Sequence, residues 1–297
     1  MRYRALVVGV VVLAACSSDP KVIDTPETVP VTTLSSAATV DASASAPTTE
    51  AATESSLVEA SIAATSDAVD AQAGHFRTLP VGSALPSDAE CAAQVRPTEE
   101  IRPTNTPFNS VRGNGPAQTP AFYSRVTGDF TGTTDEIIQW AACKWGFDED
   151  IVRAQAAKES GWFQDFRGDF TPDPANCVPG HDLGDDGEDG QCPESIGMLQ
   201  TRYQYMTPSF PMAADSTAYN LDVSFAARRS CFEGNEPWLN DYERGAEYAA
   251  GDLWGCVGMW FTGRWHTPDG DEYASAVQQY LSDRIWETDD FARWSPP

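Results

Sequence analysis

Hydrophobic positions are unevenly distributed along this chain of 297 residues. An apolar run from Ala5 to Ala15 follows two arginines, and it is too short to cross a bilayer as a helix. From Ser17 to about Pro86 the chain is rich in Ala, Ser, Thr, Val and Pro and almost lacks aromatic residues. All nine tryptophans lie beyond residue 139. The pattern predicts an export signal, then a long segment without a core, then one folded part.

Apolar residues at helical spacing predict the first two long helices of the folded part. Residues 134–146 carry four of them on one face, namely Ile137, Ile138, Ala141 and Trp145. A second helix is expected to begin after Asp148, a good N-cap, and to end near Glu159, where Gly161 can stop it. Further helices are predicted over 221–233, 246–261 and 271–286.

These patterns define the expected domain organisation. Residues 16–86 cannot bury enough apolar surface to offset the entropy of ordering, so they are expected to form a disordered tether. Residues 87–297 suffice for one core, and strand patterns are weak there. We therefore expect a mainly α domain with at most a small sheet. Its first part, 87–130, is rich in Pro and Gly and is expected to be irregular.

The end of the apolar run indicates how the chain is processed. Residues Leu13-Ala14-Ala15-Cys16 resemble the lipobox that a lipoprotein signal peptidase cleaves. The resemblance implies a signal peptide at 1–15 and fatty acyl chains, such as palmitate, on Cys16. Two or more chains would hold the protein firmly on the outer side of a cell membrane. An ordinary signal peptide with a chance cysteine is the alternative.

Six cysteines remain after Cys16, and an even number in an exported chain favours three disulfides. Fifteen pairings are possible. Cys177 with Cys192 is favoured because the two bracket a loop of Gly and Asp, and closing that loop would contribute about 3 kcal/mol. The remaining pairs are expected to be Cys91 with Cys143 and Cys231 with Cys256. With no CxxC spacing and three histidines, we expect no structural zinc site.

Strong negative charge narrows the range of partners. The formal charge of −25 becomes −27 when the two arginines of residues 1–15 are removed, and residues 17–86 hold nine acids and two bases. This leaves −20 on residues 87–297. Nucleic acid is excluded as a partner because phosphate binding needs a basic face. The charge favours solubility, and we expect a monomer.

One carboxylate has a sequence context suited to acid catalysis. Glu159 continues the apolar stripe of Val152 and Ala156, and it lies at a helix C-terminus, where the dipole disfavours negative charge. Burial beside Trp162 or Phe163 would act in the same direction. Both effects raise the pKa of a carboxyl group, as a general acid near neutral pH requires.

Three motifs follow Glu159-Ser160 in order. The first runs from Ser195 to Gln200, with Gly197 allowing close approach of a ligand to the backbone. Gln200 could pair with an acetamido group or a hydroxyl. Asn220 lies at the start of a helix, and Trp260-Phe261-Thr262-Gly263 forms an aromatic-x-x-Gly segment.

This order and spacing resemble those of the soluble lytic transglycosylases and the goose-type lysozymes, over roughly 133–286. The resemblance implies an α+β lysozyme-like fold, no cofactor, and cleavage of peptidoglycan between N-acetylmuramic acid and N-acetylglucosamine. Glu159 matches the single catalytic acid. The positions implied to bind substrate are Ser160, Met198, Gln200, Asn220 and Trp260. The family usually has a tyrosine and an asparagine where this chain has Trp260 and Phe261, so the phenol that would touch Glu159 is missing.

Other functions remain open from the sequence. A hydrolytic lysozyme often uses a second carboxylate, for which the candidates are Asp165, Asp169 and Asp173. The change at Trp260-Phe261 would also suit a non-catalytic wall-binding or structural lipoprotein on the same fold. A cysteine peptidase using His266 is not favoured, because six paired cysteines leave no free thiol.

The acidic loop 182–190 and the aromatic residues complete the set of candidate binding features. Clustered carboxylates and glycines in that loop could bind calcium, although the loop departs from the EF-hand pattern. Aromatic residues that could stack on sugars are Trp162, Tyr203, Tyr205, Trp260 and Trp265, of which one or two are expected in the cleft.

Overall fold

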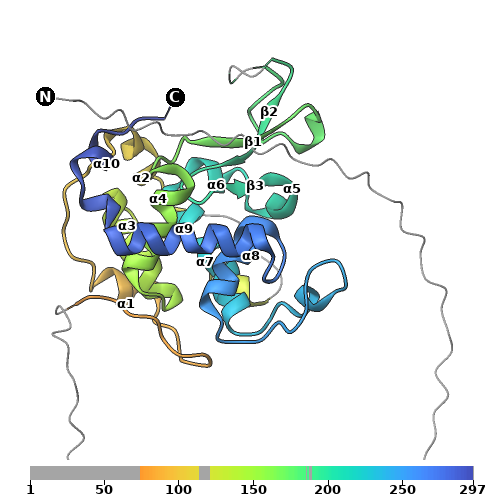
Figure 1. The fold of residues 1–297 in the computed structure, drawn as a ribbon. Coiled ribbons are helices and arrows are strands. Elements are labelled where there is room, and N and C mark those ends of the chain that lie inside the picture. Colours follow the sequence, from red (N-terminus) through yellow and green to blue (C-terminus); the bar gives the residue numbers. More distant parts are fainter. Residues whose placement is uncertain (1–73, 114–120, 185, 187–188, 297) are drawn as a thin grey trace, which may run out of the picture. The chain divides into compact units, whose positions relative to one another are not determined.

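The computed structural model describes residues 74–113, 121–184, 186 and 189–296 (Figure 1). The predicted signal peptide, Cys16 and residues 17–73 of the predicted tether lie outside these ranges. The described part contains ten α-helices and one small antiparallel sheet, which confirms the predicted mainly α fold.

The helices and strands have the following bounds. The α-helices are α1 (Asp88–Ala92), α2 (Thr106–Asn109), α3 (Thr134–Trp145), α4 (Glu149–Ser160), α5 (Tyr203–Met206), α6 (Met212–Asp215), α7 (Thr217–Phe232), α8 (Leu253–Thr262), α9 (Pro268–Asp283) and α10 (Asp289–Arg293). The 3₁₀-helices are η1 (Pro103–Asn105), η2 (Ala121–Arg125), η3 (Pro174–Asn176), η4 (Thr207–Ser209), η5 (Pro237–Asn240) and η6 (Ile285–Glu287). The strands are β1 (Arg167–Thr171), β2 (Cys192–Ile196) and β3 (Thr201–Arg202).

Local capping explains why α3 and α4 form where they were predicted. Thr133 and Glu136 form a capping box at the start of α3, each side chain accepting from the other's backbone N–H. Asp148 caps α4 by accepting a hydrogen bond from the backbone N–H of Asp150. Gly161 then ends α4 with a φ of 61°, in the left-handed region that glycine adopts most easily. Both predictions are confirmed, and the position of Glu159 in the last turn of α4 follows.

Helix α7 is the centre of the domain. All sixteen of its residues are buried, and it packs against α3, α6 and α8 (Figure 1). One buried charge of this helix is paired, since the Asp222 carboxylate lies 2.7 Å from the Lys144 ammonium of α3. The prediction at 221–233 was right in kind, but the helix begins four residues earlier, at Thr217, where Ser216 caps it.

The next two predicted helices have different starts in the structure. Helix α8 begins at Leu253 rather than 246, because the backbone N–H of Gly251 bonds back to the carbonyl of Phe232 and turns the chain. Residues 233–252 therefore form a loop that contains η5. Helix α9 begins at Pro268 rather than 271, because Thr267 caps it and proline suits the first helical position.

The sheet is small, as predicted, and it borders the cleft described below. Its order is β1-β2-β3, with Arg167 opposite Ile196 and Ser195 opposite Arg202. In Figure 1 the sheet and α5 lie at one edge of the domain, whereas the 233–252 loop projects separately beside α7 and α8.

Three disulfides connect the pairs expected from the sequence. Cys91 bonds to Cys143, Cys177 to Cys192, and Cys231 to Cys256. The second closes the acidic loop between η3 and β2, and the third closes the 233–252 loop between α7 and α8. The pairing prediction is confirmed.

Residues 74–86 correct the predicted boundary of the tether. They were assigned to the tether, but the backbone N–H of Leu79 donates to the carbonyl of Gly146 at 3.0 Å, and the N–H of Gly82 donates to Glu233 at 2.7 Å. The buried guanidinium of Arg229 donates to the carbonyls of Leu79 and Pro80. Composition missed this segment because buried side chains of the domain bind its backbone.

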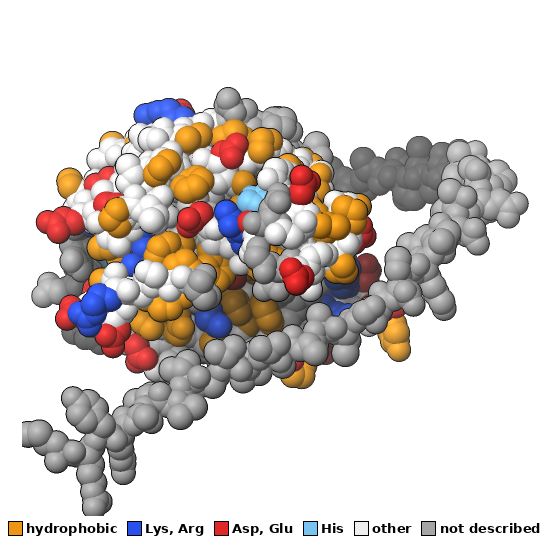
Figure 2. Space-filling view, turned by 90° about the horizontal axis from the view of Figure 1, so that it is seen from above, with side chains coloured by type: hydrophobic (Ala, Val, Ile, Leu, Met, Phe, Trp, Pro, Cys, Tyr) orange, Lys and Arg blue, Asp and Glu red, His pale blue; other side chains and the backbone are white. Residues whose placement is uncertain are grey.

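The surface and the helices add two observations on location and charge. The face drawn in Figure 2 mixes acidic, basic and hydrophobic side chains, so one sign of charge does not cover it. Within the described ranges, every helix is too short or too polar to cross a membrane.

Candidate active site

A cleft of about 620 Å³ lies where the sheet, α5, α8 and the 233–252 loop meet, and it brings together three of the predicted site residues. Glu159 comes from the end of α4, Gln200 from the turn before β3, and Trp260 from α8. A pocket of this size can hold a small-molecule or sugar ligand.

The environment of Glu159 gives it the proton affinity of a general acid. Burial raises its pKa to about 7, and the nearby Asp169 carboxylate acts in the same direction. A hydrogen bond from Tyr273 and the positive charges of Arg228 and Lys158 oppose this rise. At neutral pH the carboxyl group is therefore divided between its acid and base forms.

The aromatic residues expected to bury Glu159 lie elsewhere. The indole of Trp162 donates to the carbonyl of Arg153 at 3.0 Å, and its ring contacts Phe291 with centroids 5.3 Å apart. Phe163 packs edge-on against Trp294. Neither ring lines the cleft that holds Glu159.

Tyr273 of α9 contacts Glu159, and sequence reasoning did not identify it. Its hydroxyl donates to Oε1 of Glu159 and accepts a hydrogen bond from Nε2 of Gln155 at 3.2 Å. Its ring stacks on Phe261, with centroids 4.9 Å apart and planes 9° from parallel. Burial and the neighbouring Glu159 raise the pKa of Tyr273 well above its ordinary value, so the phenol stays protonated. A phenol from position 273 therefore lies beside Glu159.

Trp260 and the buried Arg228 form the layer beneath the cleft. The indole N–H of Trp260 donates to the carbonyl of Leu199 at 3.0 Å, which leaves its half-buried ring along the cleft. The guanidinium carbon of Arg228 lies 4.1 Å from the Trp260 ring and 4.5 Å from the Phe225 ring. Nη1 of Arg228 bonds to the carbonyl of Ser224, while its Nε and Nη2 have no hydrogen-bond partner among the described residues.

Gln200 lines the cleft, but its amide is engaged within the protein. Nε2 donates to the carbonyls of Phe166 at 3.1 Å and Gly197 at 2.8 Å, and Oε1 lies 3.2 Å from the hydroxyl of Ser195, whose one proton it shares with Asp169. The residue has a φ of 49°, in the left-handed region. Its amide protons therefore hold the turn in shape, and one lone pair of Oε1 remains for a ligand.

Three predicted substrate-binding residues lie in the packed wall behind the cleft. Asn220 and Met198 are fully buried, and Ser160 is 2% exposed. The Ser160 hydroxyl donates to the carbonyl of Met198 at 3.0 Å, which ties α4 to the turn. None of these three side chains lines the cleft, and their contact with substrate stays a prediction.

Asn220 organises the turn that carries Gln200. Its Oδ1 accepts from the backbone N–H of Leu199, and its Nδ2 donates to the carbonyls of Ile196 and Ala213. A Cβ on Gly197 would lie 2.3 Å from Nδ2 of Asn220, so only glycine fits there. Gly197 and Asn220, which belong to two different motifs, are therefore in direct contact.

Asp169 and Glu236 are the two further carboxylates that line the cleft beside Glu159, and Asp169 is the one named from the sequence. It projects from β1 with a φ of 52°, and its Oδ2 accepts from the Ser195 hydroxyl at 2.9 Å. The other two candidates, Asp165 and Asp173, are exposed and do not line the cleft. The structure therefore selects one of the three carboxylates named from the sequence.

Aromatic residues line the cleft, and the number of the named ones among them agrees with the one or two expected. Of the five named, Tyr205 and Trp260 line it. The structure adds three that were not named, namely Tyr123, Trp238 and Phe261. Tyr205 is 71% exposed and Trp238 is 37% exposed, so both rings are accessible to a ligand.

The acidic loop predicted as a calcium site is only partly described. Residues 185, 187 and 188 lie outside the described residues. The Asp186 carboxylate lies 2.7 Å from Arg167 and 3.0 Å from His181, so it already has two nitrogen partners. Calcium binding in this loop remains a hypothesis.

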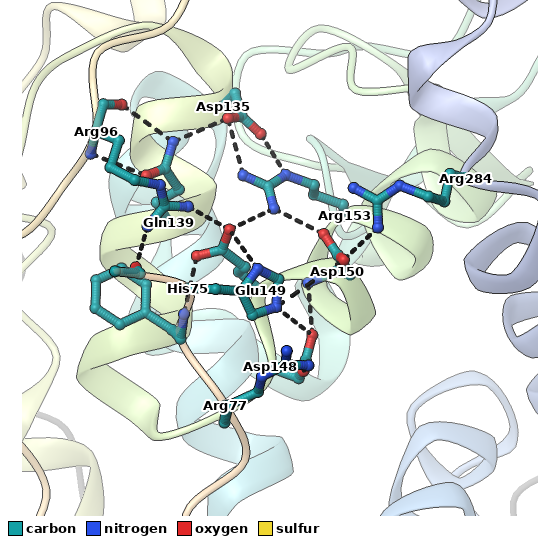
Figure 3. Close-up of polar contacts among 12 residues, drawn as sticks. His75, Arg77, Arg96, Asp135, Gln139, Asp148, Glu149, Asp150, Arg153 and Arg284 are labelled. Carbon is teal, nitrogen blue, oxygen red and sulfur yellow. Dashed lines mark hydrogen bonds and ion pairs between the residues drawn. The ribbon is translucent and has the colours of Figure 1, made fainter. Parts of the chain in front are cut away.

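A separate polar cluster contains a possible metal-ligand group, His75 with Glu149 and Asp150 (Figure 3). Its carboxylates already accept from guanidinium groups: Glu149 from Arg96 and Arg153, and Asp150 from Arg153. Burial would raise the pKa of Glu149, but the two arginines outweigh it and hold the pKa at about 2. The cluster attaches the chain at His75 to the start of α4 as an ion-pair network.

Comparisons with family models, curated proteins and solved structures found no match to this chain. The case for a function therefore depends on the geometry of the cleft.

Replacing Tyr273 by Phe is expected to shift the pH dependence of any reaction that uses Glu159 as an acid. In the parent, the hydrogen bond from Tyr273 stabilises the carboxylate of Glu159. Its loss should therefore raise the pKa of Glu159 by about one unit. The decline of kcat/KM at high pH should move up by the same amount. Tyr280→Phe, on the same helix, is the control and should leave the profile unchanged. An unchanged profile in Tyr273→Phe would contradict the assignment.

Proposed function

We propose that this protein is a lytic transglycosylase that cleaves peptidoglycan strands between N-acetylmuramic acid and N-acetylglucosamine. The observation that carries the proposal is Glu159, a carboxyl group with a pKa raised to about 7 that lines an aromatic cleft and accepts a hydrogen bond from Tyr273. One carboxyl group near this pKa can serve first as an acid and then as a base.

The proposed reaction needs no water. Protonated Glu159 gives its proton to the glycosidic oxygen, and the bond from that oxygen to C1 of the muramic sugar breaks. The sugar's own acetamido oxygen stabilises the cation at C1. The Glu159 carboxylate then takes the proton of the 6-hydroxyl, whose oxygen bonds to C1 and closes an anhydro ring. Tyr273 would stabilise the carboxylate formed between the two steps.

The aromatic side chains of the cleft support a sugar substrate. Tyr205 and Trp238 present exposed rings, and Trp260 presents a half-buried ring whose orientation is held by its bond to Leu199. Aromatic faces of this kind pack against the apolar faces of pyranose rings.

Tyr273 and Asp169 bear on the alternatives. Loss of a phenol beside Glu159 was the reason to consider a non-catalytic protein, and Tyr273 occupies that place. A hydrolytic lysozyme is favoured by one specific observation, namely that Asp169 lines the same cleft as Glu159 and influences its pKa. Asp169 could then act on water or on the sugar cation.

Product masses distinguish the two reactions. Peptidoglycan digested by the full chain is expected to yield muropeptides lighter by one water than hydrolysis products, which indicates anhydro ends. Asp169→Asn should then keep the product type and lower the rate by less than about tenfold, whereas a lysozyme that depends on this carboxylate would lose at least about a hundredfold. Products with ordinary reducing ends would show that the reaction is hydrolysis and not transglycosylation. If no fragments are released, both proposed reactions are refuted.

We also propose that the protein acts from the outer side of a cell membrane, anchored by lipid on Cys16. The lipobox-like residues 13–16 support this location. Mass spectrometry of the protein isolated from membranes would show acyl chains on an N-terminal Cys16, and Cys16→Ser would release it.

A further inference from the structure

The 233–252 loop holds an arginine at a defined place in the cleft. The backbone N–H of Arg244 donates to the carbonyl of Asp241, and its carbonyl accepts from the N–H of Trp265, both at 2.7 Å. Its Nη1 donates to the carbonyl of Gly263 at 3.0 Å, at the end of α8. The loop is closed by the Cys231–Cys256 disulfide. Backbone and guanidinium are thus both tied to the cleft wall.

The charge of Arg244 is not neutralised by the described residues around it. It is exposed, and it forms no ion pair with a described carboxylate. The other arginine of the cleft, Arg202, differs because it pairs with Glu194. In a region of net charge −20, as counted above over residues 87–297, an unpaired guanidinium lining a cleft is a local exception. Nε and Nη2 of Arg244 remain for a ligand.

An accessible aromatic ring adjoins this guanidinium. The guanidinium carbon of Arg244 lies 5.6 Å from the centre of the Trp238 ring, which is 37% exposed. Trp238 has its own support, since its indole N–H donates to Glu236. The pair presents a flat apolar face beside a forked hydrogen-bond donor, which suits a carboxylate carried on an organic group.

We infer that Arg244 and Trp238 form a subsite for the acidic peptide carried by the muramic sugar. This rests on the proposed function, because the glycan strand must occupy the cleft that holds Glu159. In a peptide-bearing strand the lactyl carboxyl group of the muramic sugar is consumed in the amide bond to the peptide, so the free carboxylates beside the sugar belong to the peptide stem. The subsite therefore makes strands with free peptide carboxylates the preferred substrate and strands whose peptide carboxylates are amidated a poorer one.

Binding to the full chain carrying Glu159→Gln tests the subsite without turnover. Three probes are measured by titration calorimetry: a disaccharide with a peptide stem, the same compound with its peptide carboxylates amidated, and the bare disaccharide without peptide whose lactyl carboxyl group is amidated. The free carboxylates should strengthen binding by about tenfold over the amidated compound. Arg244→Gln should remove that difference and leave the affinity for the bare disaccharide unchanged.

Two further variants make the result specific. Arg264→Gln, an exposed arginine that does not line the cleft, should behave as the parent. Arg244→Lys keeps the charge but not the fork, so it should retain part of the preference. Equal binding of the free and amidated compounds, or equal weakening of all three by Arg244→Gln, would overturn the subsite while the proposed function stands. If the disaccharide itself fails to bind, the proposed function fails too.

Discussion

Glu159→Gln should lower the rate of glycan cleavage by about a thousandfold, because it removes the proton that the leaving oxygen requires. The amide keeps the size of the side chain and can still accept a hydrogen bond from Tyr273. Release of soluble muropeptides from purified peptidoglycan, measured by chromatography and mass spectrometry, gives the rate. Activity within tenfold of the parent would refute Glu159 as the acid.

A glutamate elsewhere in the cleft provides the control. Glu236 lines the same cleft and accepts hydrogen bonds from Ser230 and Trp238, so Glu236→Gln removes a cleft charge without touching the proposed acid. We expect it to retain activity within about tenfold, which is the range for a residue outside the chemical step.

Glu159→Gln should also change the free energy of unfolding in a pH-dependent manner, and this measurement shows that the variant is folded. The folded-state pKa of Glu159 is raised to about 7, so its favourable effect on stability is fully present below the ordinary value of 4.5. That effect is lost as pH rises through 7. Glu159→Gln should therefore match the parent at pH 4 and be more stable by about 3 kcal/mol at pH 8. Denaturant unfolding at the two pH values measures the difference.

Asp222→Ala should lower the free energy of unfolding by about 3–5 kcal/mol, the range for removing one partner of a buried ion pair. The Asp222 carboxylate accepts from the Lys144 ammonium and the Trp145 indole, each at 2.7 Å. It also accepts from the backbone N–H groups of Thr127 and Gly128. One substitution therefore leaves several buried donors without this acceptor.

Urea unfolding followed by circular dichroism measures the effect of Asp222→Ala. Asp165→Ala, which removes an exposed carboxylate, is the control and should change stability by less than about 0.5 kcal/mol. A loss below about 1 kcal/mol in Asp222→Ala would show that the buried pair contributes little beyond what water supplies in the unfolded chain.

Features set by short segments could be predicted from the sequence. Asp148 and Gly161 mark the ends of α4 because capping depends on residues within a few positions of each other. The pair Cys177–Cys192 follows from proximity along the chain, since the two residues are 15 apart. Glu159 was identified because the end of a helix and the neighbouring serine are local signals.

Features set by long-range packing could not be predicted. Tyr273 contacts Glu159 across 114 positions of sequence, and no motif marks it. Asn220 occupies a motif position, but it is buried beneath the Gly197 turn. Only the tertiary structure shows that its side chain holds this turn in place and does not face the cleft. The segment at Leu79 has the composition of a tether and is ordered because Arg229 binds its carbonyl group from α7.

The lipobox-like pattern at residues 13–16, the helices around Glu159 and the Cys177–Cys192 pair could thus be recognised from the sequence itself, because each depends on neighbours in the chain or on a short motif. The tertiary structure alone decided which groups surround Glu159. Burial, Tyr273, Arg228 and Asp169 together set its pKa near 7, and they come from separate elements that only folding brings to one place.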